Sequence, residues 1–166
     1  MASKMNILPT IIIYGIPCSF ILSIVILAML LYNPRLLLQD YPKDVQQKVP
    51  PKTPAEKRAS AAWATVIFLV MLAFPLAAAL SAKATQYNFL AVFLSAFGVA
   101  FLFNLVDLLI MDWLIVCTIT PKFLVIPGTE GMAGYKNYAM HFKGFLIGAG
   151  VSVVLSLLLA TLVMYL

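Results

Sequence analysis

Charged residues are scarce in this 166-residue sequence. Only 10% of the residues are charged, whereas soluble globular proteins usually carry about a quarter. Hydrophobic residues make up 63% of the chain, so too little polar material remains to cover a water-soluble globule. The composition therefore excludes an ordinary soluble domain and predicts an all-α polytopic protein that lies in a lipid bilayer.

Residue types that often carry chemistry are also few. The chain has two cysteines and one histidine, and it contains no CxxC, GxSxG, HExxH or Walker sequence. A single histidine excludes a bis-histidine haem held by one chain, and a c-type haem attachment motif is missing as well. Cys18 and Cys117 lie at membrane depths that differ by roughly half a bilayer, too far for a disulfide. We therefore predict two free, buried thiols, and neither a cofactor nor a metal follows from the sequence.

Long apolar runs dominate what is present. Each of four runs reaches the ~20 residues that a helix needs to cross a hydrocarbon core of ~30 Å. The predicted spans are about 7-32, 59-82, 89-111 and 144-166, with loops at about 33-58 and 119-143. They predict a single four-helix transmembrane domain over residues 1-166. The first run is too long for a signal-peptide core, and no small-x-small cleavage pattern follows inside it, so we expect it to be a span.

Basic residues are distributed unevenly between the two sides of the predicted membrane. Nine of the eleven Lys and Arg residues lie in the two long loops, and only Lys4 and Lys83 lie on the other side. This bias predicts cytoplasmic loops and both termini outside, in the plasma (inner) membrane. The net charge of +5 then reflects topology and attraction to anionic lipids, about 1 kcal/mol per basic residue near the surface. Nucleic-acid binding is not predicted, because the membrane separates the basic residues.

The last span carries small residues at every fourth position. They are Gly144, Gly148, Ser152, Ser156 and Ala160. A small-xxx-small ridge lets helix backbones approach closely in lipid. We predict a packing seam here, with a homo-oligomer through Gly144, Gly148, Ser152 and Ser156 as a second use of the same ridge.

Both long loops contain helix signals. Thr53-Pro54-Ala55-Glu56 has the capping hydroxyl, the first-position proline and the third-position glutamate that mark a helix start. The preceding segment 40-49 predicts one short surface helix, ended by Pro50 and Pro51. In the second loop, Thr129 is expected to cap a helix that continues into the last span.

Acidic residues in the third span indicate where chemistry can occur. In NLVDLLIMDWL, Asp107 lies at the inner edge of the hydrocarbon core and Asp112 about 7.5 Å further on. Ionisable groups at this depth usually face the bundle interior and rank as functional candidates. At α-helical spacing the two carboxylates are about 140° apart. We therefore expect Asp107 to face inward with Asn104, and Asp112 to mark the membrane interface with Trp113.

A candidate pocket follows from the residues expected at the same level. It would join the third span to the second loop, with Arg35 and Asp40 from the first loop as lids or ion partners. The members are Asn104, Asp107, Asp112, Glu130, Tyr135, Tyr138 and His141. Three chemistries fit: a proton or cation site, a site for zinc or a harder divalent ion, and an acid/base pair acting on a lipid or prenyl substrate.

Three functions remain open from the sequence. The leading hypothesis is a small transporter or ligand-binding membrane protein whose site opens to the cytoplasm and centres on Asp107. The alternatives are a membrane enzyme that uses His141 and a carboxylate on a lipid-like substrate, and an accessory subunit without chemistry. A structural explanation competes with all three, because Asp107 can pair with Arg35 or a lysine and His141 can bond a backbone carbonyl.

Overall fold

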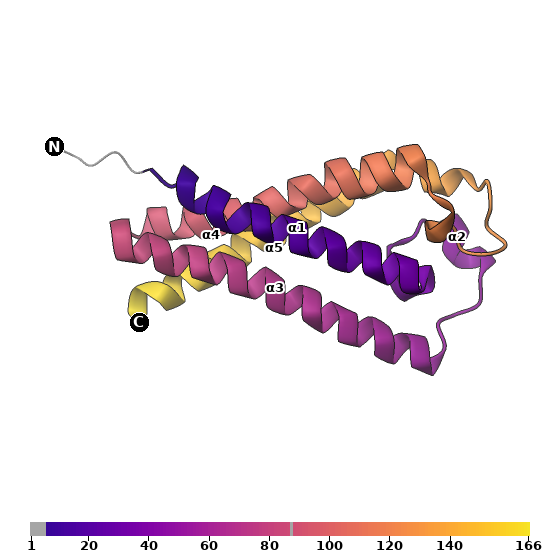
Figure 1. Ribbon diagram of the computed structural model, residues 1–166, viewed down its shortest axis with the longest axis horizontal. Coiled ribbons are helices and arrows are strands. Elements are labelled where there is room, and N and C mark those ends of the chain that lie inside the picture. The colour runs from indigo at the N-terminus through magenta and orange to yellow at the C-terminus, as the bar shows by residue number, and fades with distance from the viewer. Residues whose placement is uncertain (1–5, 87) are drawn as a thin grey trace.

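The computed structural model describes residues 6–86 and 88–166. Within these ranges every regular element is helical, and four helices are long and apolar enough to cross a membrane (Figure 1). They are α1 (Leu8–Tyr32), α3 (Pro54–Gln86), α4 (Phe89–Val106) with its π-helical continuation η2 (Asp107–Ile119), and α5 (Tyr138–Tyr165). The predicted all-α, four-span fold class is confirmed. Cys18 and Cys117 are free and buried, as predicted.

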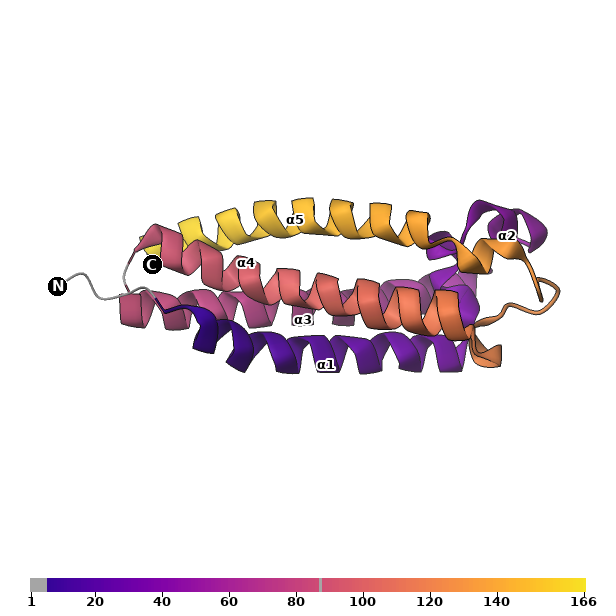
Figure 2. The ribbon, with the colours of Figure 1, turned by 90° about the horizontal axis from the view of Figure 1, so that it is seen from above.

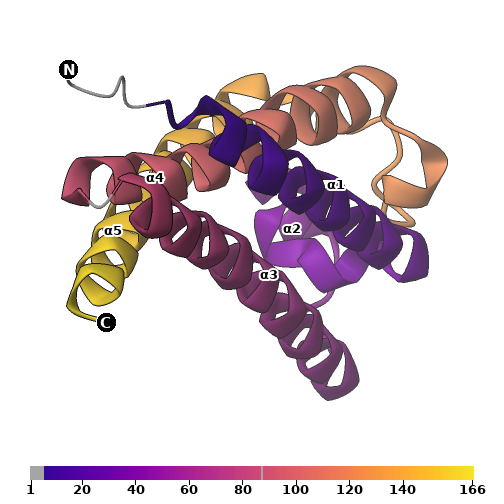
Figure 3. The same ribbon diagram turned by 60° about the vertical axis from the view of Figure 1, so that its left-hand side comes forward.

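The helices form an elongated bundle with both long loops at one end, here called the loop end (Figure 2). Helix α4 lies in the middle and packs against α1, α3 and α5. Small buried residues allow these close contacts, among them Ala96 and Ala100 of α4. The first turns of α3 stand away from α4 and α5 at the loop end (Figure 3).

The small-residue ridge of α5 packs inside the chain. Ser152 and Ser156 are buried, and the Asn104 amide of α4 donates to the Ser152 hydroxyl over 2.8 Å. A Cβ added at Gly148 would collide with the Asn104 side-chain oxygen, so a larger residue here would displace the Asn104 amide. The predicted seam therefore joins α5 to α4. A homo-oligomer through the ridge stays a prediction, and this packing leaves Ser152 and Ser156 little surface for it.

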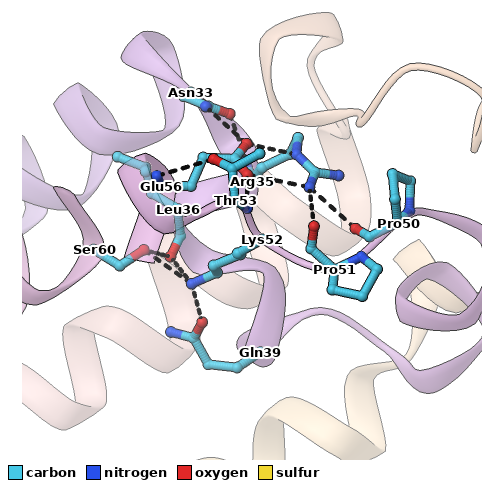
Figure 4. Close-up of polar contacts among 10 residues, drawn as sticks. All are labelled: Asn33, Arg35, Leu36, Gln39, Pro50, Pro51, Lys52, Thr53, Glu56 and Ser60. Carbon is cyan, nitrogen blue, oxygen red and sulfur yellow. Dashed lines mark hydrogen bonds and ion pairs between the residues drawn. The ribbon is translucent and has the colours of Figure 1, made fainter. Parts of the chain in front are cut away.

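A polar network fastens the first loop to the start of α3 (Figure 4). Thr53 and Glu56 form the predicted capping box: the Thr53 N–H donates to the Glu56 carboxylate over 2.7 Å, and the Glu56 N–H donates to the Thr53 hydroxyl over 3.2 Å. The same carboxylate accepts from Arg35 Nε over 2.6 Å. Lys52 donates to the Leu36 carbonyl, the Gln39 side chain and the Ser60 hydroxyl. This network holds the 3₁₀ helix η1 (Pro34–Asp40) in place.

The two long loops share a small hydrophobic core. The predicted surface helix is α2 (Lys43–Lys48), which follows η1 directly. The second loop contributes the short 3₁₀ helices η3 (Lys122–Leu124) and η4 (Ala133–Lys136). Tyr41 donates its hydroxyl hydrogen to the Leu124 carbonyl over 2.7 Å, and its ring meets the ring of Tyr135 edge to face. These contacts hold Tyr41, and with it the neighbouring Asp40, beside the second loop.

The expected helix cap at Thr129 is wrong. Thr129 is fully buried, its hydroxyl donates to the Ile126 carbonyl over 2.6 Å, and it lies 2.7 Å from the Tyr135 hydroxyl. Gly131, with a φ of +74°, then turns the backbone away from a helical path. Helix α5 is capped instead by Asn137, whose side chain accepts from the Met140 N–H over 3.0 Å.

Candidate functional site

The third span changes its winding at Asp107. From Asp107 to Ile119 the backbone is π-helical, so its hydrogen bonds join residues five apart. The segment ends at Thr120, whose N–H donates to the Ile115 carbonyl over 2.8 Å and whose φ of +49° is left-handed. π-Helical turns are rare and occur frequently at functional sites.

This winding brings Asp107 and Asp112 to the same side of the helix. The expectation that the two carboxylates lie about 140° apart assumed α-helical geometry and is wrong. Residues five apart are successive members of the π-helical hydrogen-bond ladder. Both carboxylates consequently line one pocket.

Asp112 contacts His141, in the first turn of α5, at hydrogen-bonding distance. The His141 Nδ1 atom lies 2.9 Å from Asp112 Oδ1, and the two side chains are 11% and 24% exposed. The other ring nitrogen, Nε2, is buried and has no hydrogen-bond partner among the described residues. With the Nδ1 proton donated to Asp112, a neutral ring leaves Nε2 as a free acceptor.

A pocket of about 540 Å³ surrounds these groups at the loop end. Residues of the first loop, of α4 and η2, and of α5 form its wall. They are Gln39, Asp40, Tyr41, Lys43 and Gln46; then Asn104, Asp107, Leu108 and Asp112; then Met140, His141, Gly144 and Phe145. The pocket therefore reaches from the loops into the membrane-spanning helices.

A second, smaller cavity of about 80 Å³ lies on the other side of the same polar residues. Asp40, Tyr41, Asp107, Asp112 and His141 line both spaces. The remaining wall of the small cavity is mostly apolar, including Ile26, Leu30, Leu37, Met111, Val116 and Leu124. The polar groups thus lie between the open pocket and the small hydrophobic core that the two long loops share.

The Asp107 carboxylate differs from the carboxylates of Asp40 and Asp112 in having no hydrogen-bond partner among the described residues, although it interacts electrostatically with Asp112 and His141. Within the described part of the chain it makes no hydrogen bond or ion pair. Asp112 contacts His141, whereas Asp40 accepts from the Gln39 amide over 2.9 Å. Asp107 is therefore the acidic side chain in this pocket that is free to accept a hydrogen bond from a ligand.

The protein around the first loop also shifts the titration of its ionisable groups. Desolvation raises the pKa of Asp40, although the residue keeps solvent access; Asp112 raises it further, whereas Lys52 and Gln39 oppose the rise. Burial raises the pKa of Tyr41, so its hydroxyl stays protonated and donates to Leu124. Partial burial lowers the pKa of Lys52.

Not every residue proposed from the sequence lies in the pocket. Asn104, Asp107, Asp112, His141 and Asp40 line it, and Tyr135 lines the small cavity. Three other residues were expected at the same membrane level but do not line this pocket: Glu130, Tyr138 and Arg35.

These three residues make separate contacts. Glu130 accepts from the Gly128 N–H of its own turn over 2.9 Å. The Tyr138 hydroxyl lies 3.0 Å from the Thr118 hydroxyl, and Arg35 pairs with Glu56. Among the described residues, Arg35 therefore pairs with Glu56 and not with Asp107, so this structural explanation for Asp107 does not hold.

Sequence reasoning missed several wall residues. Gln39, Tyr41, Lys43 and Gln46 flank Asp40 on the chain, and the short helix predicted over 40-49 was the signal that could have found them. Met140 and Phe145 resemble other lipid-facing positions and carry no such signal. Among the described residues, no group of three or more His, Cys, Asp or Glu side chains is arranged to hold a metal ion.

The fold and this pocket define a class: a small multi-pass membrane protein with a polar pocket where its loops meet its membrane-spanning helices. No protein-family model matches the chain, and no curated protein or solved structure matches it.

Proposed function

We propose that this protein binds a small cation in the pocket around Asp107, and that a proton leaves the pocket when the cation enters. Asp40, Asp107 and Asp112 line one pocket in which Lys43 is the only lysine or arginine of the described wall. When all three aspartates are ionised and His141 is neutral, the wall carries two excess negative charges against one lysine, which either a bound proton or a bound cation compensates in part. This imbalance carries the proposal.

The membrane location strengthens the attraction for a cation. Like charges in a poorly solvated space destabilise one another, and either a proton or a cation relieves the repulsion. An opposite unit charge about 4 Å away contributes roughly 4 kcal/mol at an effective dielectric constant of ~20. An ammonium group also donates hydrogen bonds, which the unpartnered Asp107 carboxylate and the free His141 Nε2 can accept.

Equilibrium binding of radiolabelled ethylammonium to the purified protein tests the proposal. Calorimetric titration in two buffers of different ionisation enthalpy then counts the protons released. Asp107→Asn should weaken binding at least tenfold and remove the proton release. Glu130→Gln is the matched control, because Glu130 is a carboxylate at the same end of the molecule that binds its own turn. Ethylammonium binding that is equal in Asp107→Asn and the unchanged protein would refute the proposal.

A second function is supported by the contact between Asp112 and His141. An imidazole oriented by a carboxylate, with its second nitrogen free, is an arrangement that can act as a general base. In this second function, the base removes a proton from a lipid-like substrate that reaches the pocket from the membrane. Mass spectrometry of lipids incubated with the purified protein tests this hypothesis. A product that persists in His141→Gln would exclude His141 as the base.

A further inference from the structure

The pocket crosses the level at which the protein meets the membrane interface. Trp113 and Tyr138 mark this level: their ring centroids are 6.1 Å apart, and Trp113 Nε1 donates to the Tyr138 carbonyl over 3.4 Å. Trp and Tyr are enriched at membrane interfaces. Gly144 lies six residues beyond Tyr138 on α5, which at ~1.5 Å per residue is about 9 Å deeper. One end of the pocket therefore lies beside the loops and the other at the inner edge of the hydrocarbon region, where the predicted span 144-166 begins.

The deep end of the pocket is open to the side of the bundle. Gly144 lines the pocket and is exposed, and a Cβ added there would meet no atom within 4 Å. One turn further along α5, a Cβ at Gly148 would collide with Asn104, so the helices are closed at that point. Because Gly144 belongs to a membrane-spanning helix, the opening beside it faces lipid.

The wall of the pocket combines polar and apolar side chains. Asp40, Asp107 and Asp112 supply carboxylates and Asn104 an amide, whereas Leu108, next to Asp107, and Phe145, next to Gly144, supply apolar surface. A ligand that contacts both kinds of surface needs a cationic group and an apolar chain.

We infer that the pocket takes a long-chain alkylammonium ligand, which enters from the bilayer leaflet at the loop end past Gly144. The ammonium group lies among the carboxylates, and the chain leaves between Gly144 and Leu108 into the lipid. This inference rests on the proposed function and adds the class of ligand and its route. It requires that chain length, and not only charge, determines affinity.

Displacement of radiolabelled ethylammonium by decylammonium, with the protein in lipid nanodiscs, tests the inference. Each methylene group transferred from water to an apolar wall strengthens binding on the order of fourfold. Burial of only two of the eight additional methylenes should thus make decylammonium more than tenfold tighter. Partitioning of the long amine into lipid affects all variants equally, so variants are compared with one another.

Substitution at the opening tests the contribution of the alkyl chain to affinity separately from that of the ammonium group. Gly144→Leu should weaken decylammonium at least tenfold more than it weakens ethylammonium, and Gly144→Ala should show a smaller difference between the two amines. Gly150→Leu is the matched control. Gly150 is also exposed on α5 with no atom within 4 Å of an added Cβ, but it lies outside this pocket.

The outcomes distinguish the two proposals. If decylammonium binds no tighter than ethylammonium, or if Gly144→Leu leaves its affinity unchanged, the inference about the chain is wrong. Ethylammonium binding that still depends on Asp107 would then leave the proposed function standing. If neither amine binds, both proposals fail. Selective loss of decylammonium in Gly144→Leu, with Gly150→Leu unaffected, supports the lateral route.

Discussion

Asp107 and Asp112 lie five residues apart in the chain and line the same pocket, because the helix between them is π-helical. An α-helix would turn the second carboxylate about 140° away from the first. The unusual winding therefore assembles the acidic wall of the pocket, and it places Asp112 within 2.9 Å of His141 on α5.

The spacing of the two carboxylates can be tested by inserting one residue. An alanine inserted between Ile110 and Met111 moves Asp112 out of the five-residue register and turns it away from Asp107. We expect ethylammonium binding to weaken at least tenfold, as in Asp112→Ala. Circular dichroism and thermal unfolding in detergent provide the control for folding. A folded insertion variant with unchanged affinity would show that the register of Asp112 does not matter for binding.

The contact between Asp112 and His141 should also stabilise the fold. Removing one partner leaves a partly buried group without its hydrogen bond, so Asp112→Ala and His141→Ala should each destabilise the protein by about 1 kcal/mol. Because they share one interaction, the double variant should be less destabilised than the sum of the two. A double-mutant cycle measured by unfolding in a detergent and denaturant mixture should give a coupling energy of about 0.5–1.5 kcal/mol. Additive effects would contradict a direct interaction.

Local signals in the sequence were sufficient for much of the fold. Each long apolar run predicted a membrane-spanning helix, because hydrocarbon requires every backbone polar group to be bonded within the helix. The Thr53 and Glu56 capping box predicted the start of α3, and the structure forms both of its hydrogen bonds. Interactions between near neighbours determine these features, so they can be read without the tertiary structure.

The site was less predictable because it depends on winding and on lateral position. No residue pattern distinguishes the π-helical segment from an α-helix, so the sequence predicts too large an angle between Asp107 and Asp112. A shared membrane depth also does not fix which side chains meet: Arg35 is held by Glu56, whereas Asp40 reaches the pocket through the contacts of its neighbour Tyr41. Whether the pocket residues bind a ligand stays a prediction.

The raised pKa of Asp40 leads to a prediction about pH. The pKa of Asp40 in the folded protein lies above its usual value of 3.8. At a pH between 3.8 and the raised pKa, the folded state therefore binds more protons than the unfolded state. Stability must then fall as pH rises through that interval. Asp40→Asn removes the effect, so it should stabilise the protein at pH 7 relative to the unchanged chain. The advantage should shrink toward pH 3, as measured by the denaturant midpoint. An advantage that is constant with pH would contradict the shift.

The pair of Arg35 and Glu56 should control both stability and the shape of the pocket. The pair is partly buried, with side chains 19% and 14% exposed, and the Glu56 carboxylate also caps α3. Glu56→Ala removes the ion pair and the capping box together, so we expect a loss of about 1–3 kcal/mol in the free energy of unfolding. The adjacent exposed residue provides the control: Lys57→Ala should change stability by less than about 0.5 kcal/mol.

The same substitution should reach the pocket through η1. Arg35 is the second residue of η1, which ends at Asp40, and it also donates to the carbonyls of Pro50 and Pro51 (Figure 4). Without Glu56, Arg35 loses the contact that holds this helix against α3, so Asp40 should shift relative to Asp107. Ethylammonium affinity should therefore fall several-fold in Glu56→Ala although Glu56 does not line the pocket. If Glu56→Ala lowers stability but leaves affinity at the level of Lys57→Ala, then η1 does not depend on this pair for its position, and the contacts of Tyr41, Lys52 and Ser60 are sufficient to hold Asp40.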